Sequence, residues 1–233
     1  MAGALDICNM TLVGFLGETP LTSLDEGTVP AQVCRVVYPT IRDAMLESAW
    51  WRFATLRARL GRLQSTPTQG FQYHYGLTLT PHCLRVEGVS PAEDPWAPWE
   101  VGWTEYPYRL ELARVGSTLQ RAVATNLESA EAWYIARVDE GLFSGLFTSA
   151  LALSLAMHLI TPLSGKSSLL TQLRPLAERA LLEAKSHDSH QDTPRHIAQD
   201  ARYLAARLNG SSSVYQVGPV AAPQGQPLGV SHT

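Results

Sequence analysis

The sequence predicts a mainly α-helical α+β protein: a helical bundle with an inserted antiparallel β region and an extended C-terminal tail. Apolar residues recur every three or four positions towards both ends of the chain, as in amphipathic helices. β-branched and aromatic residues concentrate in the middle, and the stretch 210–233 is rich in Ser, Gly and Pro without periodicity. The 233 residues are 45% hydrophobic and 17% charged, which allows a sizeable core.

Two amphipathic helices are expected in residues 1–50. Gly17 ends the first of them, and Pro30 suits the first turn of the second. Pro39 lies inside the second pattern, where it is expected to kink the helix or divide it into two segments. The apolar side of the first helix consists of Leu5, Cys8, Leu12 and Phe15, and that of the second of Val33, Val37, Ile41, Ala44 and Ser48.

Residues 51–138 are expected to form the β insertion. From Trp51 onwards large and small or charged residues alternate, which marks the departure from helical periodicity. Four segments read as strands by their β-branched and aromatic content, namely 83–89, 108–112, 119–124 and 132–136. Between the first two, residues 91–107 form a turn-rich loop or irregular hairpin that contains Trp96, Trp99 and Trp103.

About three further helices are expected after Asp139. Residues 146–160 are apolar on nearly all sides but fall short of the roughly 20 residues that a bilayer requires, so they predict a buried core helix. The next helix spans about 169–184, with Pro175 as a kink or as its beginning, and the last spans about 197–208. The predicted organisation is therefore a helical domain of residues 1–50 and 139–209, the insertion 51–138 and the tail 210–233.

Charge and cysteine content exclude several classes of protein. The net charge of -3 gives no global electrostatic case for coating nucleic acid or an anionic membrane. Cys8, Cys34 and Cys83 are widely separated and odd in number, so buried thiols are expected instead of a disulfide framework. No basic stretch followed by an apolar core opens the chain, and a soluble protein of intracellular origin is expected.

Catalytic motifs have no support in the sequence, and neither an enzymatic activity nor a cofactor is predicted. Residues 164–167, Ser-Gly-Lys-Ser, resemble the end of a phosphate-binding loop, but Ile160 stands where that motif needs glycine, and a helix precedes where it needs a strand. We interpret them as a turn between helices. A polar cluster in 187–196 predicts a solvated loop, with a metal site as the alternative. Its members are His187, Asp188, His190, Asp192 and His196.

Four arginines follow the pair Trp50 and Trp51, and they are the first candidate interface. They are Arg52, Arg57, Arg59 and Arg62. Basic residues beside aromatic ones can contact phosphates or bases, but the near-alternate spacing also fits a solvated strand face or the rim of a subunit interface. Contacts with a partner or with another subunit are the preferred interpretation, and Trp50 and Trp51 belong either to that interface or to the core of the monomer.

Ten short blocks of the sequence are collinear with those of a known protein family. The first five are LGETPL (16–21), AQVCRVVY (31–38), IRD (41–43), WWRFA (50–54) and YGL (75–77). The others are PHCLRV (81–86), AWYIARVD (132–139), LFSGLF (142–147), TPLSGK (161–166) and EAK (183–185). Each block is weakly specific, but their shared order and gaps over roughly residues 4–190 resemble the tail tubular protein A family, the head-to-tail adaptors of short-tailed bacteriophages.

The resemblance implies a viral structural protein without enzymatic activity. Copies would form a twelve-membered ring between the portal and the tail nozzle, with tail fibres as a further contact, and genomic DNA would cross the lumen without sequence-specific binding. The location would be the virion neck, after synthesis in the host cytoplasm and without a membrane. Trp96, Trp99, Trp103 and the tail residues Val214, Tyr215 and Val217 complete the candidate interface, because rings close through large heterologous contacts rich in aromatic residues and arginine.

Two rival functions stay open at this point. One is a non-catalytic scaffold or binding module outside a virion, built on the same helical frame. The other is a metal-dependent enzyme that uses the segment 187–196.

Overall fold

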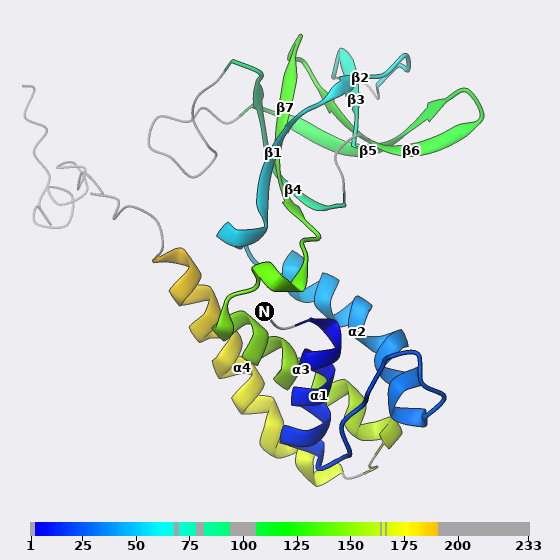
Figure 1. Ribbon diagram of the computed structural model, residues 1–233. Helices are drawn as coiled ribbons and strands as arrows, with labels where there is room; N and C mark the ends of the chain where they lie inside the picture. The colour runs from blue at the N-terminus through cyan, green and yellow to red at the C-terminus, as the bar shows by residue number, and fades with distance from the viewer. Residues whose placement is uncertain are drawn as a thin grey trace, which may run out of the picture. The chain divides into compact units, whose positions relative to one another are not determined.

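The computed structural model describes residues 3–67, 70–77, 82–93, 106–163, 165 and 167–190 (Figure 1). The helices are α1 (Ala4–Thr11), α2 (Val29–Glu47), α3 (Gly145–Leu163) and α4 (Ser167–Ser189), and α1 continues as a π-helical turn, η1 (Leu12–Leu16). The strands are β1 (Thr55–Arg59), β2 (Gly61–Arg62), β3 (Tyr73–Gly76), β4 (Cys83–Pro91), β5 (Tyr108–Val115), β6 (Thr118–Thr125) and β7 (Ala130–Ala136). Two 3-10 turns, η2 (Arg52–Ala54) and η3 (Glu140–Leu142), lie where the chain passes between helices and strands.

The four α-helices share one hydrophobic core, which we call the helical lobe. Helix α3 is central, because it contacts α1, α2 and α4 and buries side chains on several sides, from Phe147 to Ile160. Among the described residues α3 is also the one helix long and apolar enough to cross a membrane. Since its buried residues pack against the three other helices, its hydrophobicity is explained by this core, as the sequence predicts.

Helix α2 corrects two expectations. It runs without interruption through Pro39, which lies on the exposed side, where the lost amide hydrogen bond disturbs no packing. Its buried side is rotated from the expected one. Ala44 and Ser48 are exposed and Val33, Val37 and Ile41 only half-buried, whereas the buried residues are Ala31, Cys34, Tyr38, Met45 and Leu46. Contact with α3 and α1, which the periodicity alone does not reveal, selects this side.

Local signals place the other helix boundaries well. Gly17 adopts a left-handed conformation (φ 71°) directly after η1, and this conformation ends the helix at the expected residue. Gly165, also left-handed, lies between α3 and α4. Gly165 therefore comes after a helix, where a phosphate-binding loop needs a strand. Helix α4 passes through Pro175, so that proline does not mark its beginning.

The strands form two antiparallel sheets with a second core, the β lobe. One sheet has the order β1-β7-β4 and the other β2-β3-β6-β5. Leu60 connects β1 to β2, and its N–H donates to the carbonyl of Ala130 (2.9 Å), so one continuous segment contributes to both sheets. The largest buried side chains of this core are Tyr75 and Tyr134. All four predicted strands are confirmed, as β4, β5, β6 and β7.

The prediction of a mainly helical, bundle-dominated fold is wrong. Helix accounts for 47% and strand for 26% of the described residues, and the strands have a core of their own. The error arises in β1, β2 and β3, whose short segments carry arginine and histidine among the apolar residues and give weak strand signals. The predicted helix 197–208, the tail 210–233 and the tryptophan loop 94–105 lie outside the described residues.

The cysteines agree with the prediction of unpaired thiols. Cys8 and Cys34 are buried and Cys83 is half-buried, and none of the three forms a disulfide. A hydrogen bond with Cys34 together with burial raises the pKa of the Cys8 thiol far above its usual range. Cys8 therefore packs as a small apolar residue without nucleophilic reactivity.

Candidate functional site

The two tryptophans at the entrance to the β lobe are placed differently. Trp51 is fully buried in the helical core, and its ring meets Phe147 edge-on at 4.8 Å between ring centroids. Its Nε1–H donates to the carbonyl of Met45 (2.9 Å). Trp50 is half-buried and packs against the same core. For Trp51 the core alternative therefore holds, and its side chain is not available as an interface anchor.

Two of the four candidate arginines make contacts within the monomer. Arg57 forms an ion pair with Glu131 and lies over the ring of Trp133 (5.0 Å to the centroid), across the β1–β7 pair. Arg52 is half-buried, and its backbone N–H donates to Asp188 at the end of α4 (2.7 Å). The side chain of Arg57 thus packs across one sheet of the β lobe, and the backbone of Arg52 contacts α4.

The other two arginines are exposed on the β lobe. Arg59 lies on β1, and Arg62 lies on β2 over the ring of Tyr73 (4.0 Å to the centroid). The structure thus divides the four arginines into two that are half-buried and two that are exposed. The remaining candidate interface residues, which are Trp96, Trp99, Trp103, Val214, Tyr215 and Val217, lie outside the described residues.

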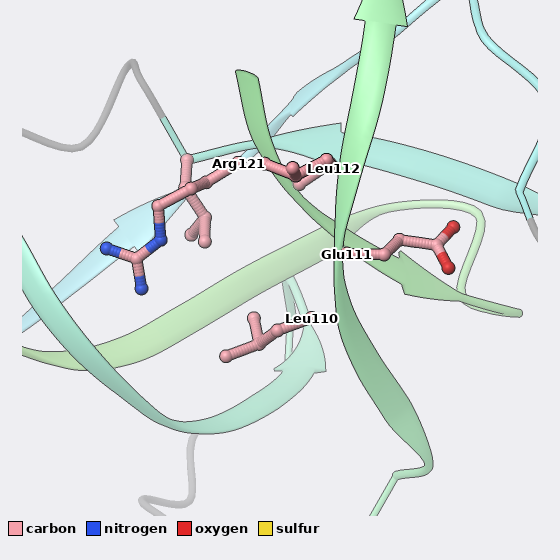
Figure 2. A pocket seen from close by; sticks show the side chains of 6 residues that line it. Leu110, Glu111, Leu112 and Arg121 are labelled. Atoms are coloured by element: carbon pink, nitrogen blue, oxygen red, sulfur yellow. The ribbon is translucent and has the colours of Figure 1, made fainter. Parts of the chain in front are cut away.

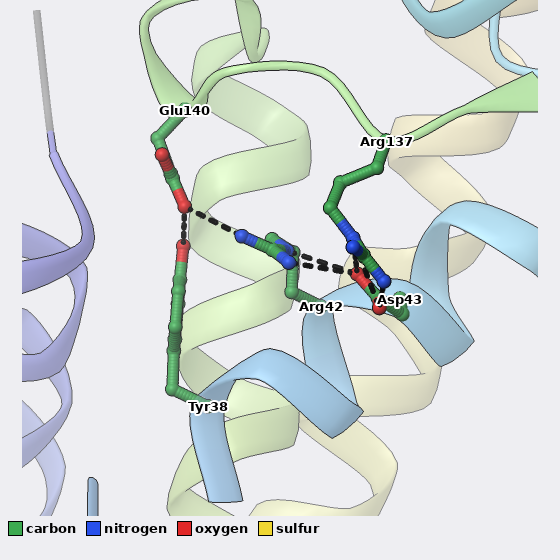
Figure 3. A network of polar contacts seen from close by, with 5 residues as sticks. All are labelled: Tyr38, Arg42, Asp43, Arg137 and Glu140. Atoms are coloured by element: carbon green, nitrogen blue, oxygen red, sulfur yellow. Dashed lines mark hydrogen bonds and ion pairs between the residues drawn. The ribbon is translucent and has the colours of Figure 1, made fainter. Parts of the chain in front are cut away.

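A network of five polar side chains ties the helical lobe to the end of β7 (Figure 3). Tyr38 Oη and Arg42 Nη1 donate to the same oxygen of Glu140, at 3.0 and 3.1 Å. Asp43 lies between Arg42 and Arg137, accepts from Arg42 Nε (3.0 Å) and forms a two-pronged ion pair with Arg137. Bidentate arginine–carboxylate pairs are directional, so this network fixes the exit of the β lobe against α2.

The electrostatics of the network keep Asp43 ionised. Partial burial opposes the charge, but hydrogen bonds from Arg137 and Arg42 and their positive charges outweigh it, and the pKa of Asp43 is lowered. Burial and the neighbouring Glu140 raise the pKa of Tyr38, so its hydroxyl stays protonated and donates. The site can hold two elements together, but it presents no polarised nucleophile or base to a substrate.

Cationic side chains also occupy the C-terminal end of α2. Arg85 from β4 donates to the carbonyl of Glu47 (2.6 Å), and Lys185 from α4 donates to that of Ser48 (3.1 Å). The last carbonyls of a helix lack intrahelical partners and carry partial negative charge. The two cations satisfy two of these carbonyls and connect α2 with β4 and α4. We call these contacts, together with the network of Tyr38, Arg42, Asp43, Arg137 and Glu140, the joint between the lobes.

The polar cluster near the end of α4 is partly inside the described chain. Asp188 is buried and accepts the Arg52 N–H through Oδ2, while His190 follows the end of α4, and its Nδ1 contacts the carbonyl of Ser186 in that helix. Asp192 and His196 lie outside the described residues. Within the described part of the chain, no three His, Cys, Asp or Glu side chains are placed to hold a metal ion.

Asp188 is a buried carboxylate that costs stability. Burial raises its pKa in spite of the Arg52 hydrogen bond, and Oδ1 has no hydrogen-bond donor among the described residues. Because the folded state holds the proton more tightly than the unfolded chain, stability falls as the pH rises above the unfolded pKa of about 3.9.

We therefore expect Asp188→Asn to raise the free energy of unfolding by about 1 kcal/mol at pH 7. The gain should disappear below about pH 4, where the aspartic acid is neutral as well. Urea unfolding at both pH values measures it, and Glu183→Gln on the exposed side of α4 is the control with no expected change. If Asp188→Asn lowered the free energy of unfolding at pH 7, burial of the ionised Asp188 carboxylate would not be destabilising.

One cluster escaped the sequence analysis: Ser65, His74 and Glu111. His74 is buried on β3, its Nδ1 lies 2.7 Å from Ser65 Oγ, and its Nε2 contacts the Glu111 carboxylate from β5. The order serine–histidine–carboxylate is that of a nucleophile, a base and an orienting group. A hydrolytic site also needs oxyanion donors and a substrate cavity.

The groove described beside this cluster does not serve it. It has a volume of about 210 Å³ and is bordered by Leu77, Leu110, Glu111, Leu112, Arg121 and Ala122. Figure 2 shows the leucines and Arg121 on one side, with the Glu111 carboxylate pointing away from them. Since side chains alternate across a strand, the groove and His74 belong to opposite faces of the sheet. We interpret Ser65, His74 and Glu111 as a buried polar cluster that links β3 to β5.

Comparison with known proteins adds no assignment. No protein-family model matches this chain, and no curated protein matches it.

Proposed function

We propose that this chain is a non-catalytic structural subunit of a bacteriophage head-to-tail adaptor. Copies of it form a ring, twelve-membered by resemblance to the tail tubular protein A family, between the portal and the tail nozzle. The collinear sequence blocks, arranged as helices on either side of an antiparallel β insertion, carry this proposal. The proposed subunit is not the mainly helical one expected from the sequence, because its helical lobe and its β lobe each have a hydrophobic core.

The joint between the lobes suits a subunit whose two lobes must keep a fixed orientation. A ring closes only if each copy presents two complementary faces at a fixed angle. Arg42, Asp43, Arg137 and Glu140 link α2 to the end of the β lobe with ion pairs from two arginines. Such a network resists bending better than an apolar contact, which can slide.

Exposed apolar side chains on both lobes support assembly. Large aliphatic residues are more than one third exposed on α2, α4, β5 and β6. They include Val29, Val36, Leu110, Leu112, Leu119 and Leu176. Subunits of permanent assemblies bury such residues against neighbours. The net charge of -3 is compatible with a conduit that does not retain DNA.

Native mass spectrometry of the purified protein, alone and mixed with the portal protein of the same virion, tests this function. The expected result is a closed oligomer, or one that forms on the portal. A monomer under both conditions would contradict the adaptor, and a closed oligomer that ignores the portal would favour a scaffold outside the virion.

A further inference from the structure

The β5–β6 hairpin carries two large apolar side chains that the monomer core does not cover. Along β5, Leu110 and Leu112 alternate with Glu111 and Ala113, a pattern that ordinarily turns the leucines to the core. Here Leu112 is 67% exposed and Leu110 is also exposed, whereas Ala113 is buried and the Glu111 carboxylate contacts His74. In the strand register Leu110 lies opposite Val123, so the leucines share the sheet face of the buried Val123 and Tyr75, and Glu111 and His74 occupy the other face. This leucine face, which carries Leu110 and Leu112, therefore continues the β-lobe core to an exposed apolar edge.

This leucine face is hollowed and basic. The groove between Leu110, Leu112 and Arg121 gives it relief that a partner side chain can fill (Figure 2). Arg114 and Arg121 lie on the leucine face, whereas Arg109 shares the opposite face with Glu111, the one carboxylate of residues 108–125, which is engaged by His74. A partner for this hairpin must therefore combine apolar side chains with negative charge.

The helical lobe of the same chain offers such a surface. Val29 and Val36 are 62% and 71% exposed and lie seven residues apart, on one side of α2. Asp25 and Glu26 immediately precede the helix, and Asp25 is held beside it by an exposed ion pair with Arg35 (3.8 Å). We call these four residues, Asp25, Glu26, Val29 and Val36, the α2 outer face.

The two lobes also differ in charge: basic residues slightly outnumber carboxylates in the β lobe, and carboxylates outnumber basic residues in the helical lobe. Residues 51–138 contain nine arginines and eight carboxylates, three of the latter outside the described residues. Residues 1–50 and 139–190 contain eleven carboxylates and six basic residues. Copies that meet β lobe to helical lobe attract one another, whereas helical lobes that meet symmetrically repel. The charge distribution favours a head-to-tail contact, the type that closes rings.

We propose that the β5–β6 hairpin of one copy docks on the α2 outer face of the next copy. Leu110 and Leu112 cover Val29 and Val36, while Arg114 lies against Asp25. The inference rests on the proposed function and names the surfaces through which its ring closes.

A matched pair of leucines tests the apolar part. Leu112 on β5 and Leu182 on α4 are 67% and 68% exposed, so glutamate at either position leaves the fold intact. At a subunit concentration where the unmodified chain is assembled, Leu112→Glu should weaken assembly by about tenfold or more and Leu182→Glu should not. Native mass spectrometry gives the assembled fraction, and circular dichroism verifies the fold. Unchanged assembly of Leu112→Glu, or equal loss in both variants, would overturn the docking.

A charge exchange tests the named partner surface. Arg114→Glu and Asp25→Arg should each weaken assembly by about tenfold, and a chain with both changes should recover to within about threefold of the original. No recovery would overturn the pairing. If Leu112→Glu keeps the ring but loses binding to the tail nozzle, the hairpin serves another tail protein and the assignment to a second copy is wrong.

Failure of this inference is distinguishable from failure of the proposed function. Rings that form from the unmodified chain and survive Leu112→Glu retain the adaptor and reject the hairpin contact. An unmodified chain that stays monomeric with and without portal rejects both.

Discussion

Trp51→Ala is expected to lower the free energy of unfolding by about 4 kcal/mol, a large part of the stability of an ordinary domain. The fully buried indole packs against Phe53 and Phe147 and donates to the carbonyl of Met45, so its removal leaves a cavity and takes away one hydrogen bond. Trp51→Phe retains the aromatic contacts and should cost about half as much.

Chemical unfolding followed by circular dichroism measures both variants. All chains are compared at one subunit concentration, because assembly stabilises the folded state. If Trp51→Ala were as stable as the original chain but failed to assemble, Trp51 would lie at an interface and its place in the helical core would be wrong.

Asp43→Ala should cost about 2 kcal/mol at pH 7, because it leaves Arg42 and Arg137 without their shared acceptor. The folded-state pKa of Asp43 lies below its unfolded value, so the ionised carboxylate stabilises the protein above about pH 4. This contribution is lost as the pH falls through the folded-state pKa. The stability difference between the original chain and Asp43→Ala should therefore shrink on acidification.

Urea unfolding from pH 7 down to pH 3 measures this difference. Glu183→Ala is the control, because Glu183 is exposed on α4 and should change stability by less than about 0.5 kcal/mol. A pH-independent loss in Asp43→Ala would mean that the carboxylate acts through packing instead of charge. If both variants lost equally little free energy of unfolding, the network around Asp43 would not be what holds the lobes together.

The sequence predicted the elements whose signals are local. Helical periodicity identified α1 and α3, glycine marked the end after η1, and alternation with β-branched residues identified β4 to β7. It failed where tertiary contacts override the pattern. The buried side of α2 is set by α3, and the strands from Thr55 to Gly76 carry charged residues that pair across the sheet, as Arg57 does with Glu131.

The candidate site was less predictable, because its parts are distant in the sequence. Asp43 and Arg137 are 94 residues apart, and His74 and Glu111 are 37 apart, so no spacing rule relates them. A local signal did exist on β5. Leu110 and Leu112 alternate with a glutamate, which predicts the core side of the sheet correctly, but the pattern does not reveal that both leucines stay exposed there.

A cryo-electron microscopy reconstruction of the purified protein bound to its portal tests the central claim most directly. We expect a closed ring with rotational symmetry around an open channel, in which neighbouring copies meet through opposite faces. A single copy bound to the portal, an open filament, or no complex at all would contradict the role of this chain as an adaptor subunit.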